Sequence, residues 1–401
     1  MASEMIAPTM KPKPSFAEIL MAGSIGLMLS YATLYLCIVP LLPDVASGRD
    51  FVAYWATGQQ LIHHASPYDA AAMARIEHTA GFTQKNAVGF MRNPPWGLLL
   101  TLPLGLTGVR TGALLWSVLL LACLAFSVRM LWLMHKRPLN IIPWLVASFA
   151  PALLGLTMGQ TSLFALLGYV LFLRFHQSRP FLAGVCLWLC TLKPHLLLVL
   201  GVVLFAWILV SKNYKILLGA IAALTASCAV TTCIDPAAWV DYQQMLRTGG
   251  IQKEFIPCLS IVLRLWISPR STWIQYLPAA MGCGWGLSFF WPRRHSWNWM
   301  RDGNLLMLVS ILLAPYCWLF DQTLAIPALM YGAYRTRSRI LLVVLALASP
   351  VILIELLFCG VTLQSPSHLW MAPFWLAWYL CATRIKTRPA EILCNNTAIA
   401  E

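Results

Sequence analysis

The chain has 401 residues, of which 59% are apolar and only 10% are charged, whereas about 25% of the residues of an ordinary soluble domain carry charge. Its mean hydropathy is +0.72. So few charges cannot cover the surface of a soluble protein of this length. The composition therefore excludes a soluble enzyme, a disordered chain and a fibrous repeat, and predicts an all-α polytopic membrane protein.

The charged residues are strongly unbalanced, with 28 Lys and Arg against 14 Asp and Glu. No basic run alternates with aromatic residues on a polar face, so we expect no nucleic-acid partner. Lys and Arg instead collect in short cytoplasmic loops, where they meet anionic lipid headgroups. The expected partner of this charge is the lipid bilayer.

Basic clusters alternate with pairs of apolar runs along the chain, which predicts about 12 spans with both termini in the cytoplasm. The first run is longer than the apolar core of a cleaved signal peptide, so it is expected to remain as a span. The sequence 1–401 then forms one membrane domain, with cytoplasmic segments at 1–18 and 384–401. The predicted spans are 19–42, 110–134, 140–158, 160–174, 180–192, 195–211, 214–234, 271–291, 303–320, 322–334, 339–360 and 368–383.

Two long loops, 43–93 and 235–270, fall on the extracytoplasmic side of this arrangement. The first contains helical patterns over 50–63 and 69–79, with Asp69 as an N-cap. The second has helical spacing over 239–246 and an apolar stretch over 255–266. We expect these segments to be helices that lie in the membrane interface. The short apolar stretch 94–107 is expected to be an interfacial or re-entrant helix.

Three predicted spans, 160–174, 180–192 and 322–334, are shorter than the roughly 17 residues needed to cross a bilayer. Each begins or ends at a polar break on the outer side: Gly159-Gln160, Lys193-Pro194 and Asp321-Gln322. Polar backbone and charge at membrane depth are tolerated only beside a protein-lined or watery cavity. The short spans therefore predict a cavity in the outer half.

The few ionisable residues at this outer boundary are the candidates for chemistry, and each has a structural alternative. Asp50 is expected to be a general base at the rim of the cavity or a helix N-cap. A lone intramembrane Lys193 is expected to be functional, or to snorkel to the headgroups. Asp321 needs a partner or caps a helix. Arg264 either pairs with a phosphate or snorkels.

The remaining polar residues give weaker predictions. His195 is expected to be a packed histidine rather than a ligand. Arg92, like Arg49, Arg247 and Lys253, is expected to steer an anionic substrate. Glu355 is expected to lie near the outer end of its span or to pair with an Arg. The twelve cysteines form no framework, although Cys233 and Cys258 flank one outer loop and can be joined by a disulfide.

Several short motifs occur in the order found in glycosyltransferase family 87, of the GT-C superfamily. Asp50-Phe51-x-x-Tyr54-Trp55, Pro67-Tyr68 and Asn93-Pro94-Pro95-Trp96 resemble its first loop. Further similar segments are Gly159-Gln160-Thr161-Ser162, Lys193-Pro194, Pro315 to Asp321 and, more weakly, Ser260 to Arg264. The resemblance extends over about residues 15 to 380. Asn93, Cys317 and Phe320 depart from the family pattern, which leaves the sugar and the acceptor open.

The resemblance implies a multi-pass enzyme of the inner (plasma) membrane whose active site faces the extracytoplasmic side. It would move a hexose, with mannose expected, from a polyprenyl-phosphate sugar to a hydroxyl of a glycolipid or glycan, with inversion and with Asp50 as catalytic base. The expected substrate-binding residues are Lys193, Arg264, Tyr54, Trp55, Gln160, His195, Asp321 and Arg92. The donor is already activated and the motif holds a single Asp, so neither a cofactor nor a metal is expected.

Three other classes of membrane protein fit parts of this pattern. A transporter or flippase would need charges at the span centres and a repeat between the two halves, but the charges lie on one side and no repeat is found. A lipid-linked glycan polymerase would use a large outer loop between late spans. A membrane scaffold would not need Asp50, Lys193 and Asp321 on one face. The pattern favours the glycosyltransferase.

Overall fold

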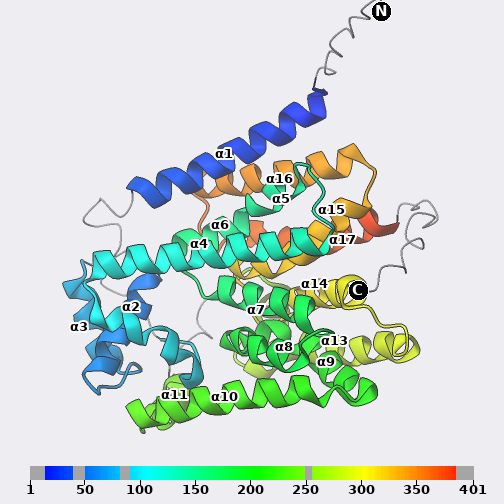
Figure 1. The fold of residues 1–401 in the computed structure, drawn as a ribbon. Helices are drawn as coiled ribbons and strands as arrows, with labels where there is room; N and C mark the ends of the chain where they lie inside the picture. Colours follow the sequence, from blue (N-terminus) through cyan, green and yellow to red (C-terminus); the bar gives the residue numbers. More distant parts are fainter. Residues whose placement is uncertain (1–13, 39–49, 82–90, 249–254, 385–401) are drawn as a thin grey trace, which may run out of the picture.

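The computed structural model describes residues 14–38, 50–81, 91–248 and 255–384, and all regular structure within these ranges is helical. The long helices lie side by side with their axes in roughly one direction (Figure 1). The α-helices are α1 (Phe16–Ile38), α2 (Phe51–Ile62), α3 (Ala70–Thr79), α4 (Val109–Met134), α5 (Ile142–Ala147), α6 (Ala150–Met158), α7 (Ser162–Phe175), α8 (Pro180–Leu187), α9 (Leu198–Ser211), α10 (Tyr214–Ile234), α11 (Ala238–Thr248), α12 (Leu259–Ile267), α13 (Leu277–Phe290), α14 (Asn304–Leu313), α15 (Ile326–Arg335), α16 (Arg339–Leu357) and α17 (Met371–Arg384).

Short 3-10 helices and a π-helix join many of these elements. The 3-10 helices are η3 (Pro95–Leu100), η4 (Leu102–Leu106), η5 (Trp188–Leu192), η6 (Pro194–Leu197), η8 (Thr272–Tyr276), η9 (Trp291–Arg293), η11 (Leu319–Ala325) and η12 (Pro366–Trp370), and η10 (Trp299–Gly303) is a π-helix.

Five described helical segments are long and apolar enough to cross a membrane: Phe16–Cys37, Val109–Met134, Pro194–Ser211, Tyr214–Ile234 and Arg339–Leu357. The segments Ser162–Phe175 and Pro180–Leu192 are apolar but shorter. The chain is therefore a polytopic helical membrane protein. The other predicted spans coincide with shorter or interrupted helices, and residues 39–42 of the first predicted span lie outside the described residues.

The prediction of one continuous span over 303–320 is wrong, because α14 ends at Leu313. Pro315 disfavours helical backbone at the residue before it, and Ala314 indeed has φ −55° and ψ 145°. The chain then runs without helix to Leu319. The break predicted at Asp321-Gln322 is displaced for the same reason, since both residues lie inside η11.

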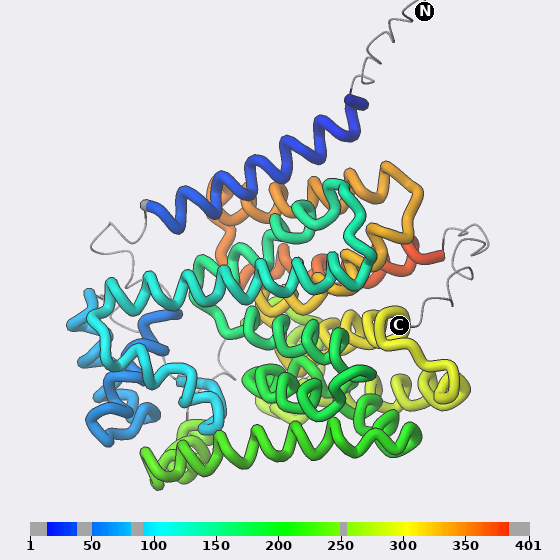
Figure 2. The backbone as a smooth tube through the Cα atoms, viewed as in Figure 1, coloured from blue at the N-terminus to red at the C-terminus, as the bar shows by residue number. Residues whose placement is uncertain are grey.

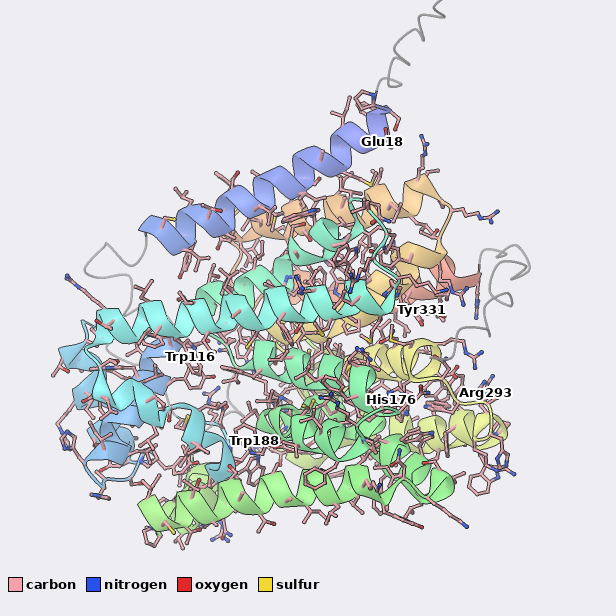
Figure 3. The ribbon with its side chains drawn as sticks, in the orientation of Figure 1. Glu18, Trp116, His176, Trp188, Arg293 and Tyr331 are labelled. Carbon is pink, nitrogen blue, oxygen red and sulfur yellow. The ribbon has the colours of Figure 1, made fainter. Side chains whose placement is uncertain are left out.

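The bundle has two distinct ends. The short helices α2, α3 and α11 gather at one end, shown on the left in Figure 1. The start of α1, the end of α17 and the turns after α4, α9 and α15 lie at the opposite end, as the path of the chain in Figure 2 shows. Figure 3 shows Glu18 and Arg293 at this second end. Both predicted outer loops therefore contribute helices to the same end of the molecule.

The first predicted loop folds as expected around α2 and α3. Asp69 is the N-cap of α3, and its carboxylate accepts hydrogen bonds from the backbone of Ala71 and Ala72. The apolar stretch 94–107 forms η3 and η4, and α2 packs closely on η4. In the second loop α11 forms as predicted, whereas α12 begins only at Leu259.

Candidate active site

The turn between α6 and α7 brings the chain close to the start of α2. Gly159 has φ +80°, in the left-handed region, where residues with a Cβ are disfavoured. A Cβ at Gly159 would also lie 2.8 Å from the Cβ of Phe51. The Trp116 indole N–H donates to the Gly159 carbonyl at 2.7 Å; Figure 3 shows Trp116 on the half of α4 nearer to α2. The next residue, Gln160, therefore starts beside Asp50.

The break between η5 and η6 places Lys193 against η11. Lys193 and Asp321 are 7% and 0% exposed, and Nζ lies 2.6 Å from Asp321 Oδ1. Nζ also donates to Gln160 Oε1 and to Ser162 Oγ, at 3.0 Å each. The Ser162 hydroxyl in turn donates to Asp321 Oδ1 at 2.6 Å. The predicted partner of the buried Asp321 is therefore Lys193, and the lysine does not snorkel.

Asp321 also performs the alternative role predicted for it. Its Oδ2 accepts a hydrogen bond at 3.1 Å from the backbone N–H of Trp318, which precedes η11. The centroid of the Phe320 ring lies 4.9 Å from Lys193 Nζ, which adds a cation–π contact to the ammonium. One carboxylate thus both caps a short helix and neutralises a buried cation.

Gln160 links this buried pair to Asp50. Its Oε1 accepts from Lys193, and its Nε2 donates to Asp50 Oδ2. Asp50 occupies the N-cap position of α2 with an exposed side chain, but that side chain makes no capping hydrogen bond. The N-cap interpretation of Asp50 therefore lacks its defining contact. Asp50, Gln160, Lys193 and Asp321 form one cluster drawn from four distant parts of the chain.

Two aromatic residues that follow Asp50 seat α2 in the bundle. The Trp55 indole donates to the Thr107 carbonyl at 2.9 Å, and the Tyr54 ring packs 5.5 Å from that of Trp116. Burial raises the pKa of the Tyr54 hydroxyl, and the charge of Asp50 raises it further, so the phenol stays protonated. Both side chains are buried. Their contacts fix the start of α2 in the bundle.

His195 packs as the sequence predicts for a histidine between apolar residues. Its ring stacks on Tyr316, with centroids 3.8 Å apart. Arg92 is half-buried and lies close enough for its charge to act on Tyr316. His195, Tyr316 and Arg92 therefore lie near the Lys193–Asp321 pair.

Arg264 faces inward from α12 and does not snorkel. It is 1% exposed, and its Nη1 donates to Gln275 Oε1 of η8 at 3.0 Å. At the start of α12 the Cys258 thiol contacts the Pro315 carbonyl, which brings this helix against the segment that leads to Asp321. Cys258 and Cys233 are both free thiols. Glu355 lies near the end of α16, and its Oε2 is 3.6 Å from His368 Nδ1.

A cavity of about 180 Å³ lies next to this segment. Its walls are mainly apolar, and Gln322, which follows Asp321 in the chain, is part of them. Gln322 is held by a hydrogen bond from the Trp375 indole at 2.7 Å. The lining of the cavity includes Cys258, Val262, Ile311, Cys317, Gln322 and Ala372.

Ser162 is the site residue that the sequence analysis did not single out. Its motif, Gly159 to Ser162, was visible, but a serine at a helix start is ordinarily a cap, and nothing in the pattern showed a lysine within reach. Among the described residues, no group of three or more His, Cys, Asp or Glu side chains is placed to hold a metal ion.

The fold and this cluster define a polytopic helical membrane protein with an ionisable site at one end of its bundle. The sequence model of glycosyltransferase family 87 matches residues 90–315, more than half of the chain. The protein belongs to glycosyltransferase family 87 and is therefore a membrane glycosyltransferase of the GT-C type. The matched range contains Gln160, Lys193 and Arg264 but not Asp50 or Asp321. No curated protein and no solved structure matches the chain.

Proposed function

We propose that this glycosyltransferase moves a hexose, mannose in the first instance, from a polyprenyl-phosphate donor to a hydroxyl of a glycolipid or glycan. The transfer takes place on the extracytoplasmic side of the inner (plasma) membrane. The observation that carries the proposal is an exposed Asp50 carboxylate tied through Gln160 to a buried ion pair. Polar groups buried at the edge of a membrane bundle are costly and are typical of functional sites.

In the proposed reaction Asp50 accepts the proton of the acceptor hydroxyl while the oxygen attacks the anomeric carbon. The bond from that carbon to the phosphate oxygen breaks, and the polyprenyl phosphate leaves with the electron pair. A single displacement inverts the anomeric centre. The donor is already activated, so the chain needs no nucleotide-binding domain.

The departing phosphate requires positive charge. Of the predicted phosphate ligands, Lys193 is occupied by three protein acceptors and neutralised by Asp321. We therefore assign the phosphate to Arg264 and Arg92, whose guanidinium groups match its oxygens, and we assign Lys193 to the support of the site.

The distribution of basic residues supports this orientation. Basic residues gather at the end of the bundle opposite to α2, α3 and α11, as in the turns after α4, α9 and α15. By the positive-inside rule, we expect that end to lie in the cytoplasm. The Asp50 cluster then faces outward, where lipid-linked donors can reach it.

The experiment that tests the function supplies radiolabelled polyprenyl-phosphate hexoses to membranes that overexpress the full chain. We expect transfer of label to a glycolipid or glycan, and about a hundredfold less or lower still with the Asp50→Asn chain at equal protein level. Absence of transfer from every donor, mannose and glucose included, would overturn the proposal.

A further inference from the structure

We propose that Gln160 is a positioning residue for Asp50 and that the buried Lys193–Asp321 pair imposes the orientation of its amide. The kinetic test of this inference rests on the function proposed above. A second test, by thermal unfolding, does not depend on it. The contacts that carry it run in an unbroken series from Asp321 to Lys193, to Gln160 and to Asp50.

The amide of a glutamine can face its two neighbours in two ways. In one orientation the carbonyl oxygen accepts from the Lys193 ammonium and the NH2 group donates to the Asp50 carboxylate. In the other, the NH2 group would face a cation and the carbonyl would face an anion, which is repulsive on both sides. A cation on one side and an anion on the other therefore fix the amide in the first orientation.

The cation itself is held in place. An ammonium has three protons, and those of Lys193 have three acceptors: Asp321, Gln160 and Ser162. Lys193 is 7% exposed and Asp321 is fully buried. Such a buried, charge-assisted pair has few alternative arrangements, so the ammonium that orients Gln160 keeps its position.

The backbone brings Gln160 within reach of Asp50. Gly159 approaches Phe51 so closely that a Cβ would lie 2.8 Å from the Cβ of Phe51. Its carbonyl is anchored by the Trp116 indole. The turn is therefore docked on the first residue of α2, and the hydrogen bond from Gln160 to Asp50 Oδ2 is a consequence of that docking.

The effect on Asp50 is to restrict rotation of an otherwise exposed carboxylate. A general base must hold its oxygen at the position of the hydroxyl proton, and a displacement of about 1 Å can cost about a hundredfold in rate. Gln160 contacts the carboxylate of the proposed base but, in this assignment, not the substrate. Its role is to orient the carboxylate of Asp50.

The first test compares kinetics of the purified full chain in lipid nanodiscs. Gln160→Ala removes the donor, so we expect the turnover to fall by about ten- to a hundredfold while the donor KM stays within about threefold. Gln160→Glu places a second carboxylate against Asp50, and two adjacent carboxylates hold a shared proton. The acidic limb of its rate profile should move to higher pH by about one unit or more.

This shift must be judged against the other groups that face the pair. Lys193 and Asp321 form a neutral pair on the far side of residue 160. Within the described ranges, the charges of Asp50, Lys193 and Asp321 act on Tyr54, His195, Tyr316 and Cys317. Gln160→Glu leaves all of them in place, so only the new carboxylate differs between the two profiles.

The second test needs no substrate. In Gln160→Glu the pair of carboxylates binds a proton more tightly in the folded state than in the unfolded state. The stability is then fully present at low pH and is lost as pH rises through the raised pKa. We expect the Tm deficit of Gln160→Glu relative to the parent to grow between about pH 5 and 8. In the double variant Gln160→Glu with Asp50→Asn this growth should disappear.

Gln59 supplies the matched control. It is a half-buried glutamine on α2, and its Nε2 donates at 2.8 Å to the backbone carbonyl of Gly105, away from Asp50. Gln59→Glu should leave the midpoint of the pH profile unchanged and should give a Tm deficit that does not depend on Asp50.

The outcomes separate the inference from the proposed function. If the parent transfers sugar but Gln160→Glu keeps the parental pH profile, Gln160 is not a positioning residue and the function stands. If the parent transfers nothing, the function fails, and the Tm comparison decides the inference by itself. A Tm deficit of Gln160→Glu that shows the same pH dependence whether or not Asp50→Asn is also present overturns the inference.

Discussion

The ammonium of Lys193 carries three protons, and in the folded chain each has an acceptor. The sequence showed a lone lysine between apolar segments, and from that pattern a role in contacting phosphate was the natural expectation. The pattern could not show that Asp321, 128 residues later, lies 2.6 Å away. A lysine whose protons are all shared with protein acceptors supports a site more readily than it binds a ligand.

Removal of one member of this pair should therefore cost more than removal of both. Lys193→Met leaves the Asp321 carboxylate buried without its cation, a loss of about 3–5 kcal/mol in known buried pairs. Lys193→Met combined with Asp321→Asn buries no net charge and should regain part of the Tm. The measurement is thermal unfolding of the detergent-solubilised chain. A double variant less stable than both single variants would contradict the coupling.

Asp50→Asn distinguishes the base from the helix cap. Asparagine still offers an oxygen to Gln160, so the fold and donor binding should persist. It cannot take up a proton, and loss of general-base catalysis lowers turnover by about 10²–10⁴-fold. Asn and Asp cap helices about equally well, so a purely structural Asp50 would make the change nearly silent. Turnover within about twofold of the parent, at equal protein level, would end the assignment of Asp50 as the base.

At the scale of elements, the placement of Asp50 depends on how α2 lies on η4. Gly58 of α2 and Gly105 of η4 face each other with no room for a Cβ on either residue. The Trp55 indole and the Gln59 amide add hydrogen bonds to backbone carbonyls of the same segment. The short helix that carries the proposed base is thus fixed by backbone contact rather than by length.

Gly58→Ala should force α2 away from η4. Overpacking of this kind typically costs about 1–3 kcal/mol, and it should lower both the Tm and the turnover, because Asp50 moves with its helix. Gly26→Ala in α1 is the control: a Cβ there meets nothing within 4 Å, so the Tm should not fall. Equal Tm values for the two variants would show that the α2 contact is not tight.

Periodicity and proline placement predicted most of these elements, including α2, α3, α11 and the N-cap at Asp69. They failed where a helix changes type or ends inside an apolar stretch. The run 303–320 stays apolar well past Leu313, and only the backbone restriction imposed by Pro315 ends α14 there. The stretch 94–107 is helical as predicted, and its two 3-10 helices are held by α10 hydroxyls, Thr231 on the Pro95 carbonyl and Ser227 on the Trp96 carbonyl.

At the scale of the whole molecule, the basic turns lie at one end of the bundle and the Asp50 cluster lies at the other. The sequence predicted that the motif-bearing loops share one side, and α2, α3 and α11 do gather at one end. The contacts within the cluster could not be predicted, because they join residues such as Asp50 and Gln160 that are 110 positions apart. Spacing along a chain carries no information about such pairs until the helices are packed.

The proposed chemistry is possible only if the end of the bundle with α2, α3 and α11 faces the extracytoplasmic side of the membrane. Reporter enzymes fused after Gly81 and after Thr248, on the cluster side, should be active outside the cytoplasm. Fusions after Arg137 and Arg294, within basic turns at the opposite end, should report the cytoplasm, because Lys and Arg near span ends are retained there. Fusion after Lys212, in the turn between α9 and α10, provides an independent inner reference. A cytoplasmic signal from the Gly81 fusion would place Asp50 on the face opposite to extracytoplasmic lipid-linked donors, and the assignment of the active site would then be untenable whatever the activity of the variants.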